Sequence, residues 1–260
     1  MRICRFITPD QSAPRFGIIQ GEDIRPLKQD ETFANVPHAN TDGRIPLTTA
    51  QLLTPVAPSK IICVGRNYKD HAAELGNPMP PEPLLFLKPP SAIIGSGDAI
   101  VLPAESSRVE HEGELGVIIA RTARHVRDDE DALSYVLGYT CVNDVTARDL
   151  QRQDVQFTRA KSFDTFCPVG PFIEMGIDPA DLQVTTRVNG EVRQQGRTSA
   201  MAFPVDYLIR YISRIMTLNP GDLISTGTPS GVSALHDGDG VEVEVENIGT
   251  LRNDVRSKSS

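Results

Sequence analysis

The fold and the first functional hypothesis rest on the stretch Val109-Glu-His-Glu-Gly-Glu-Leu-Gly-Val-Ile-Ile119. In an extended strand, side chains two residues apart point to one face, so Glu112 and Glu114 converge there. Two carboxylates in a cleft repel each other unless a proton or a cation lies between them. Asp144 follows later in the chain and adds a third hard oxygen donor, a donor set that suits magnesium or manganese better than zinc. The pattern therefore predicts a divalent-metal enzyme.

A second acidic segment, Val241-Glu-Val-Glu-Val-Glu246, has the same spacing and gives the alternative interpretation. Alternating valines and glutamates are typical of a strand with one face in the core and the other in water. Two features distinguish the first segment. Gly113 lies between its carboxylates, where bare backbone can approach a neighbour or a ligand. The apolar run Leu115–Ile119 that follows also indicates deeper burial.

The composition limits the classes of partner. The chain has 260 residues and a formal net charge of −8, without a basic run, which argues against a nucleic-acid partner. An anionic substrate would need local cations to hold it. No apolar run approaches the ~20 residues that span a membrane, and the N-terminus lacks a secretory h-region. The four cysteines have no paired spacing, so we expect buried free thiols and a cytoplasmic protein.

The pattern divides the chain into a small N-terminal domain over residues 1–57, a larger domain over 58–255 and a frayed tail over 256–260. Residues 2–7 and 15–19 are expected to form strands of the small domain, followed by a polar, poorly periodic stretch from Lys28 to Arg44. Pro55 and Pro58 mark the linker.

The larger domain is expected to be rich in strands, with a few helices. The expected strands include residues 60–64, 84–87 and 222–226. Helices are predicted over four segments by apolar spacing, acidic first turns or a glycine stop, at residues 68–75, 128–137, 146–153 and 204–216.

His71 and Glu74 form the first candidate for chemistry beyond the metal. They are three residues apart on the short predicted helix, hence on one face. A carboxylate beside an imidazole fixes its tautomer and makes a general base that activates water. The alternative is a surface pair that contributes roughly 0.2–0.5 kcal/mol and no chemistry. His111 alternates away from the acidic side chains and is not expected to be a ligand.

Several polar residues have both a functional and a structural interpretation. Lys88 and Lys161 lie at the ends of apolar stretches, where they either extend to water or offset the three carboxylates. Arg148 and Gln151, three apart on a predicted helix, either present a fork to a substrate carboxylate or face solvent. The loop Thr226-Gly-Thr228 offers a hydroxyl and amides to an oxyanion, but it is also a good turn.

Taken together, these segments resemble the fumarylacetoacetate hydrolase family over residues 60–255. The resemblance runs through seven pieces in register: Gly65-Arg-Asn-Tyr-Lys-Asp-His71, Phe86-Leu-Lys-Pro-Pro90, Glu112-Gly-Glu-Leu115, Asn143-Asp-Val-Thr-Ala-Arg-Asp149, Ala160-Lys-Ser-Phe-Asp-Thr-Phe166, Val188-Asn-Gly-Glu191 and Thr226-Gly-Thr-Pro229. Residues 1–57 resemble the small variable domain that many members carry at the N-terminus.

The resemblance implies a β-rich α+β fold, a mixed β-sandwich roll with a small N-terminal β domain, and a homodimer. It also implies a magnesium or manganese ion on the three carboxylates, with His71 and Glu74 as the general-base pair on a short lid helix. The positions that match the residues holding the oxo-acid end of the substrate are Arg148, Gln151, Lys161 and Thr228. None of these positions departs from the family pattern.

We therefore expect a metal-dependent hydrolase that cleaves a carbon–carbon bond in an acylpyruvate-like 2,4-diketo acid through a stabilised enolate. The alternative on the same site is oxaloacetate decarboxylation, or isomerisation or decarboxylation of a 2-hydroxymuconate type in aromatic catabolism. A non-catalytic protein that binds 2-oxo acids is a further alternative. A thiol enzyme that uses Cys63 or Cys167 has the least support.

Overall fold

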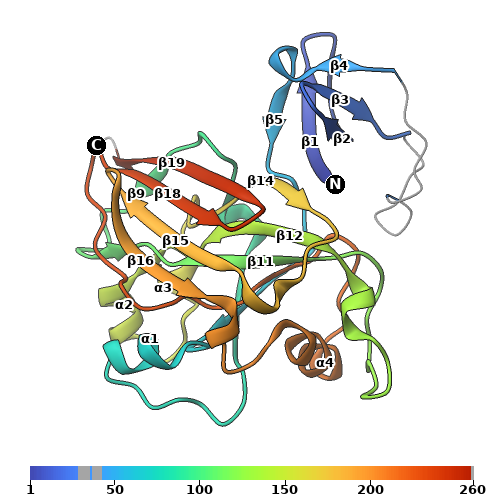
Figure 1. The fold of residues 1–260 in the computed structure, drawn as a ribbon. Helices are drawn as coiled ribbons and strands as arrows, with labels where there is room; N and C mark the ends of the chain where they lie inside the picture. Colours follow the sequence, from blue (N-terminus) through green and yellow to red (C-terminus); the bar gives the residue numbers. More distant parts are fainter. Residues whose placement is uncertain (29–35, 37–42, 259–260) are drawn as a thin grey trace.

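The computed structural model describes residues 1–28, 36 and 43–258, and the described chain is dominated by β-strands (Figure 1). Most of the polar stretch noted between Lys28 and Arg44 lies outside the described residues, as do His38 and the last two residues of the predicted tail. A long mixed sheet, a five-stranded sheet and a two-stranded pair account for the described strands. The expectation of a β-rich α+β fold is confirmed.

The long sheet crosses the whole molecule and contains the acidic strand near its middle. Its main path runs through β4 (Ile45–Pro46), β3 (Asp23–Pro26), β2 (Gln11–Gln20), β1 (Arg2–Thr8), β14 (Cys167–Glu174), β12 (Val136–Asn143), β11 (Gly113–Ile119), β17 (Leu223–Ser225), β6 (Ile61–Gly65) and β7 (Leu84–Lys88). Strand β5 (Gln51–Leu53) pairs with β1, and β8 (Ile93–Ile94) pairs with β14. Most neighbours are antiparallel, but β17 and β6 run parallel.

The five-stranded sheet has the order β16 (Glu191–Arg197), β15 (Gln183–Val188), β18 (Gly240–Val245), β19 (Gly249–Ser257) and β9 (Ile100–Leu102). The two-stranded pair is β10 (Val109–Glu110) with β13 (Thr146–Ala147). In β18 the valines are buried and the glutamates are partly exposed, which confirms the half-exposed strand. Strand β19 continues through the first two residues of the predicted tail.

Strand β11 lies between two apolar layers, and all seven of its residues are buried. Leu115 and Val117 face the five-stranded sheet and pack with Val184 and Val243, whereas Ile118 belongs to the cluster on the other side. Gly113 allows the two sheets to meet at this point, because a Cβ there would lie 2.0 Å from Thr186 Oγ1. The approach expected at Gly113 is therefore to a neighbouring strand.

The α-helices among the described residues are α1 (Lys69–Glu74), α2 (Arg148–Gln153), α3 (Thr158–Lys161) and α4 (Val205–Ile215). The strongest helix prediction, over residues 204–216, is confirmed by α4. Its buried positions include Val205, Leu208, Ile209 and Ile212, the apolar stripe seen in the sequence. Figure 1 shows α1, α2 and α3 gathered at one end of the main body and α4 apart from them.

The helix predicted over residues 128–137 is wrong. Only Ala132–Tyr135 form a short 3-10 helix, and strand β12 begins at Val136. Val136 pairs with Ile119 across the sheet, and Leu133 is 36% exposed. The apolar residues at helical spacing therefore serve two elements, because pairing with buried β11 outweighs a weak local helix preference. The segment predicted as a helix over 146–153 is split in the same way, into β13 and α2.

The N-terminal strands form a lobe at the side of the main body (Figure 1). The lobe joins the long sheet where β1 pairs with β14, with Arg2 opposite Glu174 and Ile3 opposite Ile173. The side chain of Glu174 also accepts hydrogen bonds from the amino group of Met1 (2.7 Å) and from Arg2 Nε (2.8 Å). The lobe and the metal-candidate strand thus belong to one continuous sheet.

All four cysteines are free and buried, as expected. Burial raises the pKa of the Cys167 thiol to about 12 and raises that of Cys63 as well. These thiols would rarely be ionised, which argues against a thiol enzyme. Of the helices in the described residues, none has the length and apolar character needed to cross a bilayer.

Candidate active site

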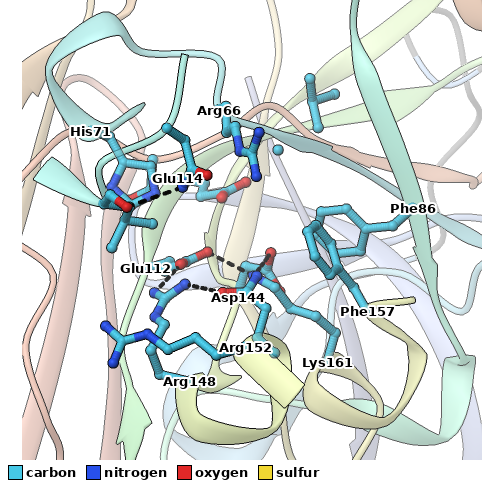
Figure 2. Close-up of a pocket in the computed structure, with 16 residues that line it drawn as sticks. Arg66, His71, Phe86, Glu112, Glu114, Asp144, Arg148, Arg152, Phe157 and Lys161 are labelled. Carbon is cyan, nitrogen blue, oxygen red and sulfur yellow. Dashed lines mark hydrogen bonds and ion pairs between the residues drawn. The ribbon is translucent and has the colours of Figure 1, made fainter. Parts of the chain in front are cut away.

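The pairing of β11 with its neighbours brings the three predicted metal ligands together (Figure 2). Gly113 pairs with Asn143 on β12, and the amide of Asp144 donates to the carbonyl of Glu112 at 2.8 Å. One carboxylate oxygen from each of Glu112, Glu114 and Asp144 lies within 4.8 Å of the others. All three side chains are buried. Local strand alternation places the glutamates, and sheet register supplies the aspartate.

Two buried lysines neutralise Asp144 from opposite sides. Lys161 Nζ donates to Asp144 Oδ2 and to Glu112 Oε2, both at 2.7 Å. Lys88 Nζ, from the end of β7, donates to Asp144 Oδ1 at 2.5 Å and to the carbonyl of Val145 at 3.1 Å. The interpretation of these lysines as cations that offset the acidic cluster is the one the geometry favours.

Arg148, the first residue of α2, holds two acidic side chains in place. Its Nε donates to Glu110 Oε2 at 2.6 Å, and one Nη donates to Glu112 Oε1. Its other Nη donates to Gln151 Oε1 at 2.6 Å. The guanidinium is buried, and three of its nitrogens have a protein acceptor. The fork predicted for a substrate carboxylate is therefore engaged within the protein in this arrangement.

The two glutamates of β11 differ in their electrostatic surroundings. Burial acts to raise the pKa of Glu112, but Lys161 and Arg148 outweigh it and hold that pKa well below its usual range. Burial, Asp144 and Glu112 raise the pKa of Glu114 to about 8, despite hydrogen bonds from Ser225 Oγ (2.5 Å) and the Gly227 amide (2.8 Å). Glu114 therefore keeps a proton near neutral pH when no metal is bound.

The raised pKa of Glu114 provides a test of whether the cluster fits a cation. Three hard oxygen donors converge, and their mutual repulsion is relieved by a proton that a divalent cation would replace. Carboxylate oxygens are the donors that magnesium and manganese prefer. Glu112, Glu114 and Asp144 therefore fit such an ion.

His71 and Glu74 form a pair beside the cluster. His71 Nδ1 lies 3.2 Å from Glu74 Oε2, and Glu74 Oε1 accepts a hydrogen bond from the Gly231 amide at 3.0 Å. The pair occupies the C-terminal turn of α1, and His71 is buried. A carboxylate on Nδ1 leaves Nε2 as the nitrogen that can exchange protons with a ligand.

The acidic cluster lines one cavity of about 230 Å³ together with His71, Arg148 and Lys161. Figure 2 shows the acidic cluster at its centre, His71 on one side and Phe86 with Phe157 on another. The two aromatic rings pack edge to face, with centroids 5.6 Å apart. Thr228 lines the cavity as well, but its hydroxyl donates to the carbonyl of Gly113 at 2.8 Å. Of the predicted site residues, all but Glu74 line the cavity, and Glu74 reaches it through His71.

His111 lies away from the acidic cluster, as its alternation predicted. Its ring nitrogens contact Gln194 Oε1 at 2.9 Å and Ser233 Oγ at 2.8 Å. Burial lowers the pKa of His111. Gln194 Oε1 also accepts a hydrogen bond from the Gly113 amide at 3.0 Å. His111 therefore belongs to a hydrogen-bond network that contacts the start of β11 away from the acidic cluster.

The cavity is also lined by residues to which the sequence assigned no role, among them Arg66, Phe86, Arg152 and Phe157. Arg66 lies in the motif Gly65-Arg-Asn-Tyr-Lys-Asp-His71 noted above, but its backbone φ of 56°, uncommon for a non-glycine residue, is visible only in the structure. Phe86 lies in a predicted strand and a quoted motif, but nothing in the sequence indicates where its ring points. Only the packing of β7, α2 and the start of α3 brings Phe86, Arg152 and Phe157 to the cavity.

Comparison with known proteins identifies the class. The family model described as fumarylacetoacetate (FAA) hydrolase C-terminal matches residues 60–256, and a model described as Rv2993c-like, N-terminal matches residues 1–55. The chain belongs to the fumarylacetoacetate hydrolase family, as the motif resemblance predicted.

Three similar proteins carry names of different activities. The mitochondrial oxaloacetate tautomerase FAHD2A of Bos taurus is 37% identical, with 98% of this chain and 91% of the relative covered. The structure of a 5-carboxymethyl-2-hydroxymuconate delta-isomerase from Mycobacterium smegmatis has a TM-score of 0.90 at 43% identity, covering 99% of this chain and 100% of that chain. The structure of a maleylpyruvate hydrolase from Sphingobium sp. SYK-6 has a TM-score of 0.79 at 34% identity, covering 99% and 100%.

These relatives include a tautomerase, an isomerase and a hydrolase, so membership of the family indicates an enzyme without fixing the reaction.

Proposed function

We propose that the protein is a magnesium- or manganese-dependent hydrolase that cleaves the carbon–carbon bond of a short acylpyruvate-like 2,4-diketo acid. The observation that carries this proposal is the His71–Glu74 pair, whose histidine lines the same cavity as the buried acidic cluster. Hydrolysis needs a base for water beside a site that stabilises an enolate, and this cavity supplies candidates for both.

Each group of cavity residues has a distinct role in the proposed reaction. Glu112, Glu114 and Asp144 would hold the ion, which supplies Lewis-acid stabilisation of an enolate when bound. Lys161, fixed by two carboxylates, adds a preorganised positive charge beside the developing oxyanion. His71 Nε2 takes a proton from water, while Glu74 stabilises the imidazolium that forms.

The test is the absorbance decay of acetylpyruvate with manganese and with excess chelator. We expect metal-dependent decay in the wild type and a loss of about 10²–10⁴-fold in kcat for His71→Gln, the range for general-base catalysis. His236→Gln is the matched control, since that histidine lies outside the cavity. Unchanged turnover of every diketo acid in His71→Gln would reject the hydrolytic role.

The second candidate is an isomerase, tautomerase or decarboxylase that uses the same enolate without attacking water. Similarity to the oxaloacetate tautomerase over 98% of this chain favours it. Enol-oxaloacetate decay and pyruvate release, measured in parallel wells, separate tautomerisation from decarboxylation. Activity on oxaloacetate alone, abolished by Glu114→Gln, would replace the hydrolase by this candidate. Binding of oxalate with manganese but no turnover would indicate a non-catalytic protein.

A homodimer is part of the proposal because the family resemblance implies one. Sedimentation velocity checks it, and a monomer over the whole concentration range would contradict it.

A further inference from the structure

A buried glutamine on the five-stranded sheet holds the peptide that lies between two of the candidate metal ligands. Gly113 separates Glu112 from Glu114, so the orientation of its backbone sets the directions in which both carboxylates leave the strand. The backbone pairing of β17 with β11 starts further along β11 than Gly113. The amide of Gly113 donates instead to Gln194 Oε1 at 3.0 Å, and its carbonyl accepts from the Thr228 hydroxyl at 2.8 Å. Side chains from two other segments thus satisfy buried backbone groups that a neighbouring strand would otherwise pair.

The donor and acceptor roles of Gln194 follow from its partners. Its Oε1 faces the amide of Gly113, which can only donate, and its Nε2 lies 2.7 Å from the carbonyl of Pro229, which can only accept. Oε1 also lies 2.9 Å from His111 Nδ1, so this ring nitrogen must carry a hydrogen. Nε2 also donates to the Thr228 hydroxyl at 2.7 Å, and the hydrogen of that hydroxyl goes to Gly113. The hydrogen bonds therefore run in one direction, from His111 through Gln194 and Thr228 to the peptide.

The network is buried and uses the full capacity of the glutamine. His111 and Gln194 are fully buried, and Thr228 is 2% exposed. A glutamine amide has two hydrogens and two lone pairs on its oxygen, and the four contacts of Gln194 occupy all of them. A fully satisfied buried network fixes the positions of its members. The Thr228 hydroxyl has only one hydrogen, so in this arrangement it supports the strand and has none left for an oxyanion.

The same glutamine reaches the loop that holds Glu74. Gln194 donates to the carbonyl of Pro229 in that loop. Further along the loop, the amide of Gly231 donates to Glu74 Oε1 at 3.0 Å. A Cβ at Gly231 would lie 2.0 Å from the carbonyl oxygen of Arg193, so the loop packs directly on β16 beside Gln194. One side chain therefore contacts both the acidic strand and the loop that binds the carboxylate of the histidine–glutamate pair.

We propose that Gln194 is a positioning residue: it fixes the Gly113 peptide and so orients the carboxylates on either side of that peptide for a divalent cation. His111 holds the amide oxygen of Gln194, and Thr228 holds the carbonyl of the same peptide. This inference rests on the proposed function only in taking the acidic cluster as the metal site. Removing groups that orient metal ligands typically lowers metal affinity by about 10–100-fold.

Manganese affinity tests the proposal without relying on turnover. Gln194→Met keeps a side chain of similar length but removes all four hydrogen bonds of the amide. Titration calorimetry of the full-length, metal-free protein should show manganese binding weakened by about tenfold or more. Gln195→Met, at the exposed neighbouring position on β16, is the matched control and should bind as the wild type does. Thermal unfolding verifies that each variant is folded at the temperature of the titration.

A second pair of variants separates positioning from packing and decides the question if Gln194→Met does not fold. His111→Asn can place an amide nitrogen near the position of Nδ1 and so keep a donor to Gln194, whereas His111→Leu cannot. We expect the asparagine variant to bind manganese more tightly than the leucine variant. A role in packing alone would give the opposite order, because leucine fills more of the buried volume than asparagine.

The direction of the hydrogen bonds also has a spectroscopic signature. Long-range nitrogen–proton NMR spectra of protein with isotope-labelled histidine distinguish the two ring nitrogens, and the signals of His111 are assigned by their loss in His111→Asn. The ring should carry a hydrogen on Nδ1 in the wild type, because Gln194 Oε1 selects that nitrogen as a donor. In Gln194→Met this selection is lost, and the Nδ1 signal should shift.

A hydrogen on Nε2 alone in the wild type, or unchanged manganese affinity in folded Gln194→Met, would overturn the proposal. A wild-type protein that binds no manganese would reject the metal site and its positioning together. Absence of diketo-acid hydrolysis, with the loss of affinity in Gln194→Met intact, would reject only the proposed reaction, so the two failures are distinguishable.

Discussion

Glu114 experiences two opposing influences, and their balance makes metal binding depend on pH. Hydrogen bonds from Ser225 and Gly227 favour its anion, whereas burial, Asp144 and Glu112 raise its pKa to about 8. A metal requires the anion, so below about pH 8 binding must displace a proton. Metal affinity should therefore increase as pH rises and level off above the pKa.

Titration calorimetry with manganese in two buffers of different ionisation enthalpy measures this proton. We expect release of about one proton per ion at pH 7 and almost none at pH 9. Glu114→Gln should abolish the release and weaken binding. Equal proton release at both pH values would show that Glu114 is not the titrating group.

Lys88 provides a second prediction at the scale of a single residue, and it concerns the stability of the protein. Its ammonium is buried against Asp144 and the Val145 carbonyl. Lys88→Met leaves a buried carboxylate with one cation fewer, so the free energy of unfolding in chelator should fall by about 3 kcal/mol. Urea denaturation measures the change, and the exposed Lys258→Met is the control.

Lys88→Met/Asp144→Asn should be less destabilised than the sum of its single substitutions, since both charges are removed together. Strict additivity would mean that the two side chains do not interact.

At the scale of elements, the contact between β11 and β15 is the tightest constraint on the acidic strand. A Cβ at Gly113 would lie 2.0 Å from Thr186 Oγ1 and 3.2 Å from Val243 Cγ1. Gly113→Ala should therefore separate the sheets, lower stability by about 1–3 kcal/mol and weaken manganese binding by shifting Glu112 and Glu114.

A double-mutant cycle checks this explanation. Thr186 Oγ1 is buried and has no hydrogen-bond partner in the described structure, so Thr186→Ala alone should cost little. Combined with Gly113→Ala, it removes the atom in closest approach and should restore part of the lost stability and metal affinity. A double variant as unstable as Gly113→Ala would place the strain elsewhere.

The same elements show what sequence can predict. The convergence of Glu112 and Glu114 follows from strand alternation alone, and α4 follows from its apolar stripe and its Asn219-Pro-Gly221 stop. Both depend on neighbours within a few residues. The helix prediction over residues 128–137 failed because Val136 pairs with Ile119, a partner that no local pattern reveals.

The candidate site likewise combines contacts that local spacing predicts with contacts that depend on tertiary packing. His71 and Glu74 contact each other as their spacing predicted, but the positions of Lys88 and Arg152 depend on how β7 and α2 pack around β11. A buried lysine and one that extends to water look alike at the end of an apolar strand. Register and packing between distant segments decide which acids each cation reaches.

At the scale of the whole molecule, the long sheet connects the N-terminal lobe to the site through β14, β12 and β11. The lobe contributes Ile3 and Ile18 to the core that also contains Cys63 and Val142, yet none of its residues lines the cavity within the described chain. It should therefore affect the stability of the sheet more than ligand binding.

Glu174 tests this separation because it connects the lobe to β14 through the Met1 amino group and Arg2. Glu174→Ala removes both charge-assisted hydrogen bonds but leaves the β1–β14 pairing, so stability should fall by about 2 kcal/mol. Thermal unfolding measures the loss, with the exposed Glu191→Ala as control, and manganese titration should give an unchanged affinity. A large drop in manganese affinity would instead show that the lobe positions the acidic strand through β14 and β12, and that its conformation is coupled to metal binding.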